Sequence, residues 1–179
     1  MCLAFFCIYF KIVPLYLNII NRNLMKKLLF IPFIFMNYLV SSQIGEGEDG
    51  LYYDGNKEIY SGEYTEKFDN DSLKLKMNVL NGELDGDVEY YFENGLKKEI
   101  RAYKNGEMYG TWLTWNESGI KIAEANYKNN KKDGKWLVWD EKGIKRYEMQ
   151  YENGKKVGVW YIWDENGVLI NEKDFNGVK

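Results

Sequence analysis

The chain has 179 residues, contains no histidine, and carries 24 basic and 27 acidic residues. Histidine is the commonest general base and metal ligand, so its absence argues against a Ser-His-Asp triad and a histidine zinc site. Four basic residues precede Gln43 and every acidic residue follows it, so Gln43–Lys179 has a net charge of −7. This balance disfavours nucleic acid and anionic membranes as partners.

The first 42 residues differ in composition from the rest. Residues 25–42 carry two lysines, an apolar run from Leu28 to Val40 and then two serines, which is the pattern of a secretory signal peptide. The run is shorter than the roughly 20 residues that cross a bilayer. We therefore expect cleavage and export, with no stable membrane insertion afterwards, rather than a retained anchor. Residues 1–24 are interpreted either as an over-called start or as an extra hydrophobic leader, and they hold both cysteines.

Residues 43–50 are expected to form a flexible linker, and residues 51–179 a repeat domain. Within that domain the sequence repeats every 24 residues, with a degenerate first unit followed by four clear ones. A fixed period of this size is typical of stacked supersecondary units. The recurring positions are Gly86, Gly110, Gly134 and Gly158; Gly95, Gly119, Gly143 and Gly167; Trp112, Trp136 and Trp160; and Tyr103, Tyr127, Tyr151 and Phe175.

Each unit is predicted to be a β-hairpin. Asn94-Gly95 and Asn166-Gly167 favour two-residue type I′ turns between runs of aromatic and branched residues, whereas the return connection is longer. Glycines recur without a 3.6-residue apolar period, which argues against helices. The fold class is therefore all-β: a single elongated, twisted antiparallel sheet of tandem hairpins.

A two-residue turn also predicts the pairing of the two strands. Trp136 should lie opposite Met149, Val138 opposite Tyr147, and Gly134 opposite Tyr151, with Gly110–Tyr127 and Gly158–Phe175 as equivalents. An aromatic ring beside a cross-strand glycine covers exposed backbone. On the other face the expected pairs are Trp115–Ile122, Trp139–Arg146 and Trp163–Ile170, the second with a cation–π contact.

The segments YKNGEMYGTWLTWNESG and YENGKKVGVWYIWDENG resemble the MORN repeat variant of bacterial proteins. The resemblance covers nearly all of Tyr52–Lys179 and implies the hairpin-repeat fold. Chains of this kind are often labelled antitoxins of the YwqK family, which implies neutralisation of a partner protein.

Few residues suggest catalysis. The carboxylate pairs Asp140-Glu141 and Asp164-Glu165 could bind calcium or act as paired catalytic acids, but separate solvated turns explain them better. Lys131-Lys132 and Lys155-Lys156 are interpreted as solubilising loop charges, although relatives of the repeat imply phosphoinositide binding. We expect no enzyme activity, no cofactor and no metal.

The aromatic ladders on the two faces are either simply core or, on one face, a binding surface. Of the two faces, the one that mixes aromatic and charged residues is the better binding candidate, since aromatic residues and arginine dominate interfaces. Its candidate residues are Trp115, Trp139, Arg146, Tyr161 and Trp163. The predicted function is an exported, non-catalytic module that binds a protein, as a scaffold or a neutralising protein. The alternatives are a glycan-binding module of the cell envelope and an antitoxin-like protein.

Overall fold

The computed structural model describes residues 43–177, which belong to one compact unit, Gln43–Lys179. The expected signal peptide and the segment before it lie outside the described residues. In the described part of the chain, no helix has the length and apolar character needed to cross a membrane.

The described residues form fourteen strands. Their bounds are β1 Gly45–Glu46, β2 Tyr52–Tyr53, β3 Gly62–Lys67, β4 Leu73–Leu80, β5 Glu83–Leu84, β6 Gly86–Tyr91, β7 Lys97–Lys104, β8 Glu107–Met108, β9 Gly110–Trp115, β10 Lys121–Lys128, β11 Lys131–Trp139, β12 Lys145–Glu152, β13 Lys155–Trp163 and β14 Leu169–Asp174.

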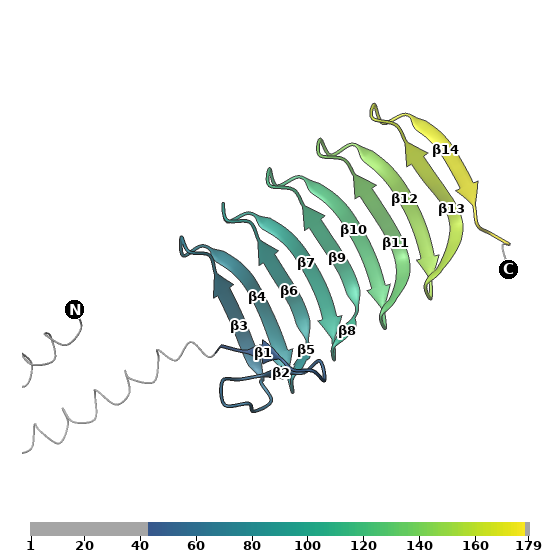
Figure 1. Cartoon of the computed structure of the whole chain (residues 1–179). Coiled ribbons are helices and arrows are strands. Elements are labelled where there is room, and N and C mark those ends of the chain that lie inside the picture. The colour runs from purple at the N-terminus through teal and green to yellow at the C-terminus, as the bar shows by residue number, and fades with distance from the viewer. Residues whose placement is uncertain (1–42, 178–179) are drawn as a thin grey trace, which may run out of the picture. The chain divides into compact units, whose positions relative to one another are not determined.

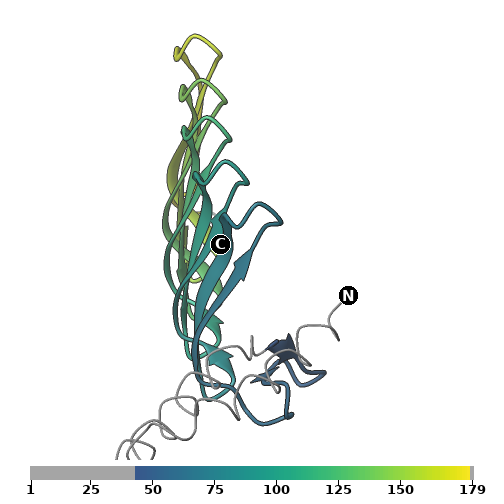
Figure 2. The ribbon, with the colours of Figure 1, turned by 90° about the vertical axis from the view of Figure 1, so that its left-hand side faces the viewer.

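Twelve of these strands make one antiparallel sheet in which spatial order follows chain order. The path runs from β3 through β4, β6, β7, β9, β10, β11, β12 and β13 to β14, with the short β5 and β8 paired to β4 and β7. Figure 1 shows the hairpins side by side as a repeating row, and in Figure 2 they form a single twisted layer. The all-β, tandem-hairpin fold class is confirmed.

The two kinds of connection are the reverse of those predicted. The return connections are two-residue type I′ turns, as at Asn153-Gly154, where φ is 49° and 83° and Glu152 pairs with Lys155. The hairpin tips instead hold three-residue loops. In the loop after Asp140, the amide of Gly143 donates to the carbonyl of Asp140. The amide of Asp140 in turn donates to the carbonyl of Ile144. A type I turn followed by a left-handed glycine, here Gly143 at φ 80°, has this pattern.

The pairing of the strands is partly as predicted. Pairs away from the tip are confirmed, including Trp136–Met149, Val138–Tyr147 and Gly134–Tyr151. Near the tip the three-residue loop shifts the register by one, and a bulge in the second strand restores it. Trp139 therefore pairs with Lys145, and the predicted Trp139–Arg146 pair is wrong because Arg146 is the extra residue of the bulge.

The same shift occurs in the neighbouring hairpins. Trp115 pairs with Lys121 rather than Ile122, and Trp163 pairs with Leu169 rather than Ile170. In each hairpin the residue predicted to face the tryptophan is the one that the bulge leaves unpaired. All three predicted pairs were wrong for the same reason: the tip loop has three residues rather than two, and a bulge follows it.

The most buried side chains lie at the N-terminal end of the sheet. Met77, Val79 and Val88 are 5%, 1% and 2% exposed, and Ile44 and Tyr52 pack against them. Ile44 lies next to β1, which pairs with β2 on one side of the sheet (Figure 2). Residues 43–50 thus differ from the flexible linker expected, because burial of this apolar patch holds the segment in place.

Candidate interaction surface

One face of the sheet carries a continuous series of aromatic rings, which we call the ladder. Consecutive ring centroids are 4.6–5.5 Å apart. Its members are Tyr103, Trp112, Tyr127, Trp136, Tyr151, Trp160 and Phe175. Such contacts are worth about 0.5–1.5 kcal/mol each beyond the area that they bury. The rings come one from each of β7, β9, β10, β11, β12 and β13, and the last, Phe175, directly follows β14, so the ladder links these hairpins to one another.

The ladder is held by hydrogen bonds as well as by ring contacts. The indole nitrogens of Trp112, Trp136 and Trp160 donate to the carbonyl oxygens of Ala102, Asn126 and Gln150, at 2.9–3.1 Å. Burial raises the pKa of the Tyr103, Tyr127 and Tyr151 hydroxyls. These features indicate that the ladder takes the place of a hydrophobic interior in a single-layer sheet.

The opposite face carries a different arrangement, which we call the tryptophan row. It consists of Trp115, Lys121, Trp139, Lys145 and Trp163, taken from successive strands β9 to β13. Cross-strand pairing places Lys121 beside Trp115 and Lys145 beside Trp139. Each ammonium group also lies over the next ring: Lys121 Nζ is 4.6 Å from the Trp139 centroid, and Lys145 Nζ is 4.0 Å from that of Trp163. The three indoles are thus separated by lysines rather than stacked on one another.

The lysines of the row are also paired with carboxylates. Lys121 donates to Glu124 at 2.7 Å and Lys145 to Glu148 at 2.9 Å, and Lys135 approaches the other oxygen of Glu148 at 3.1 Å. The hydrogen bond from Lys145 holds the pKa of Glu148 below its usual range. The row itself is therefore almost neutral, with its lysines fixed along the sheet.

Comparison with known protein families supports the repeat reading. The family model of the MORN repeat variant matches four consecutive segments, residues 84–105, 108–129, 132–153 and 156–176. Each match spans one hairpin, from just after a return turn to the next. The chain belongs to the MORN repeat variant family. A search of curated proteins found no match to the sequence.

The MORN repeats bring most of the predicted binding residues together. Trp115, Trp139 and Trp163 form the row, and the Tyr161 ring lies 5.9 Å from that of Trp163 on the same strand. Arg146 does not stack on Trp139; its Nε donates to the carbonyl of Trp163 at 3.1 Å. Its side chain links the bulge in β12 to the end of β13 and does not line an aromatic surface.

The residues that the sequence analysis missed are the two lysines of the row. Lys97, Lys121 and Lys145 recur every 24 residues, one position before the bulge residue of the first three MORN hairpins, and Leu169 takes this position in the fourth. This spacing was a usable signal. Their pairing with the tryptophans depends on the three-residue loop, and the register predicted for a two-residue turn placed them elsewhere.

The two aspartates of the MORN hairpin tips accept hydrogen bonds from the amides of their own loops. Asp140 Oδ1 accepts backbone N–H bonds from Lys142 and Ile144, which lower the pKa of its carboxyl group, the bond from Ile144 most. Asp164 does the same for the amides of Asn166 and Val168. Within residues 43–177 no three metal-ligating side chains gather to hold an ion.

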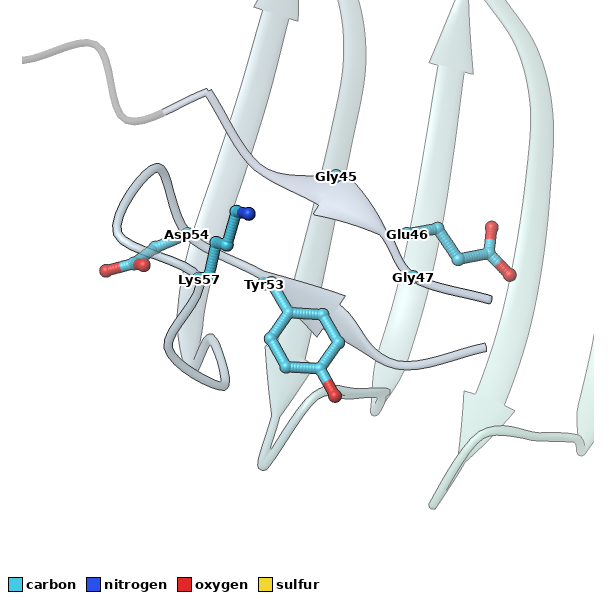
Figure 3. Close-up of a pocket in the computed structure, with 6 residues that line it drawn as sticks. All are labelled: Gly45, Glu46, Gly47, Tyr53, Asp54 and Lys57. Carbon is cyan, nitrogen blue, oxygen red and sulfur yellow. The ribbon is translucent and has the colours of Figure 1, made fainter. Parts of the chain in front are cut away.

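A hollow of about 370 Å³ lies outside the MORN repeats, beside β1 and β2. In Figure 3, Glu46 and Lys57 at its rim point in different directions, and Asp54 points away from both. Asp54 Oδ1 is already bonded to the amides of Asn56 and Glu58. The hollow therefore lacks the converging polar groups of a ligand site.

Proposed function

We propose that the protein is an exported, non-catalytic repeat module that binds a partner protein through the tryptophan row. The observation that carries this proposal is the contrast between the two faces. In the ladder every ring contacts the next ring, whereas the row keeps its three indoles apart. Tryptophans that rigid strands hold without stacking them on one another are suited to anchor a partner.

The arrangement of side chains supports recognition rather than chemistry. The row offers aromatic surface and balanced charge but no nucleophile beside a general base, the pairing that covalent catalysis requires. Rigid strands hold the rings, so little conformational entropy is lost when a partner binds. Isolated indoles can also stack on sugars, so a cell-wall glycan is the outcome to be tested against a protein partner.

The test is affinity capture with tagged Gln43–Lys179 and two matched variants. Trp139→Ala removes the central ring of the row, and Tyr147→Ala removes a ring that is 42% exposed on the ladder face. We expect one protein to be captured by the unsubstituted module and by Tyr147→Ala, and to be lost with Trp139→Ala. Equal capture by all three would place the binding surface elsewhere. A change in tryptophan emission with cell-wall oligosaccharides, without a protein partner, would establish the glycan alternative.

The export part of the proposal has its own test. The signal-peptide pattern at 25–42 predicts that the native protein is processed close to Gln43. N-terminal sequencing of the protein from cells would show a start near that residue. A native chain that still begins at Met1 or Met25 would contradict the proposal.

A further inference from the structure

The spacing of the aromatic rings in the tryptophan row limits what can lie along it. Trp115, Trp139 and Trp163 belong to β9, β11 and β13, so one strand lies between each pair of tryptophans. Neighbouring strands are about 4.8 Å apart, which places the indoles about 9.6 Å apart along the sheet. Tyr91 at the end of β6 occupies the same position one repeat earlier and extends the series to four rings.

This interval matches one conformation of an extended peptide. A polyproline II helix has three residues per turn and rises about 3.1 Å per residue, so every third side chain returns to one side after about 9.3 Å. In a β-strand the side chains on one side recur after about 6.6–6.8 Å, and an α-helical turn rises about 5.4 Å. Only the polyproline II helix can place consecutive turns against consecutive indoles.

The charges beside the row indicate what else the segment should carry. The lysines of the row are neutralised by Glu124 and Glu148. The hairpin tips that adjoin the tryptophans are acidic, since the loops 92–95, 116–119, 140–143 and 164–167 contain six carboxylates and one lysine. Those residues are Glu93, Glu117, Asp140, Glu141, Asp164 and Glu165, with Lys142. A segment that crosses the strands along the row would run beside these carboxylates.

From the ring spacing and the charge we propose that the tryptophan row binds a basic, proline-rich segment in the polyproline II conformation. This inference rests on the proposed function and names its partner class. The segment lies across the strands, with residues i, i+3, i+6 and i+9 against Tyr91, Trp115, Trp139 and Trp163. Its arginines or lysines face the acidic tips. Proline-rich segments bind aromatic-lined grooves because their conformation is set before binding and little entropy is lost.

The test compares three peptides of about twelve residues on Gln43–Lys179, with tryptophan emission and calorimetry as readouts. The first repeats Pro-Pro-Arg. The second repeats Gly-Gly-Arg, which keeps the charge and loses the polyproline II preference. The third repeats Pro-Pro-Glu, which keeps the conformation and reverses the charge. We expect the first to bind and to shift the emission, and the other two to bind at least about tenfold more weakly. Equal affinity for Gly-Gly-Arg, or no binding of Pro-Pro-Arg, would overturn the inference.

Variants locate the site and separate the two proposals. Trp139→Ala should weaken Pro-Pro-Arg binding about tenfold or more, while Tyr147→Ala on the other face should leave it unchanged. Circular dichroism of both variants confirms that the sheet is intact. If Trp139→Ala loses the captured partner protein but Pro-Pro-Arg does not bind, the proposed function stands and the polyproline II inference fails. If neither partner nor peptide responds to Trp139→Ala, both fail.

Discussion

The indole nitrogen of Trp136 donates a 3.0 Å hydrogen bond to the carbonyl oxygen of Asn126, on the neighbouring strand. Equivalent bonds join Trp112 to Ala102 and Trp160 to Gln150. The bond explains why the ladder has tryptophan rather than phenylalanine at these positions. The ring packs against its neighbours while its one polar atom satisfies a backbone carbonyl.

Replacing Trp136 by phenylalanine should therefore destabilise the sheet. The ring contacts largely remain, but the carbonyl of Asn126 loses its donor, which costs about 1 kcal/mol or somewhat more. Urea unfolding followed by circular dichroism measures the change. The matched control is Trp139→Phe, whose ring lies over Lys121 on the opposite face, outside the ladder. Equal losses for the two variants would contradict the role given to the ladder bond.

Gly134→Ala tests the close approach of adjacent strands. Gly134 has φ 99°, and a Cβ atom there would lie 3.2 Å from the Cβ of Asn126. Gly95 also has a positive φ, 83°, but a Cβ there would meet nothing within 4 Å. Gly95→Ala should cost about 1–2 kcal/mol from the backbone conformation alone. Gly134→Ala should cost about 1 kcal/mol or more beyond that, because the added methyl group crowds the Asn126 side chain. A smaller loss at Gly134 than at Gly95 would be inconsistent with this packing.

Val79→Ala tests the contribution of the N-terminal segment that covers the sheet. Val79 is 1% exposed, so the change removes buried methyl groups and leaves a cavity, at a cost of about 2 kcal/mol. Val168, which is 58% exposed, provides the control, and Val168→Ala should change the free energy of unfolding by less than about 0.5 kcal/mol. Thermal or urea unfolding of both variants distinguishes the two sites. Similar effects would mean that β1 and β2 do not shield Val79 in solution.

Asp140 should make part of the stability depend on pH. The backbone amides of Ile144 and Lys142 lower the pKa of its carboxyl group in the folded state. A depressed folded-state pKa stabilises the fold above the unfolded pKa of about 4, and this stabilisation is lost as the pH falls through the folded value. Asp140→Asn keeps an acceptor and has no charge to titrate. Asn116 already accepts the amides of Ser118 and Ile120 in the equivalent loop.

Urea midpoints at neutral pH and near pH 2.5 provide the measurement for Asp140. The unsubstituted protein should lose more stability between the two than Asp140→Asn does. Parallel losses in the two proteins would show that the carboxylate of Asp140 makes no pH-dependent contribution. Asp164→Asn should behave alike, since the amide of Val168 is the main cause of its lowered pKa.

The repeat and most of its pairing could be predicted from the sequence because they depend on local chemistry. The 24-residue period fixed the hairpins, and the alternation of side chains placed Trp136 and Trp139 on opposite faces. The tip loop was harder, because a glycine after Asn or Lys fits both a two-residue and a three-residue loop. The decisive signal was the side chain at the start of the loop, such as that of Asp140. Its carboxylate accepts hydrogen bonds from the amides of Lys142 and Ile144 within the three-residue loop.

The return turns were misjudged for a related reason. Asn153-Gly154 carries the asparagine-glycine signal of a type I′ turn, but the following lysines and second glycine made the connection look longer. Asn130 replaces the glycine at φ 62°, since asparagine tolerates the left-handed conformation. The segment 43–50 shows the limit of periodicity as a guide. Its strand has two residues, and three contacts hold it: pairing with β2, the hydrogen bond from the Gly47 amide to the Leu51 carbonyl, and the packing of Ile44 against the buried cluster.

Two positions of the repeat carry small side chains in the first hairpins and large aromatic ones in the later hairpins, which affects how the array changes in evolution. Val79 and Val88 lie where the N-terminal segment covers the sheet, whereas the equivalent positions one repeat later are Tyr103 and Trp112. In each later repeat the larger aromatic rings cover this face of the sheet themselves, and their ring contacts are only with the rings of neighbouring strands. Duplication or loss of one 24-residue unit leaves the remaining joints intact, so relatives can differ in length by whole hairpins while keeping the same cross-section.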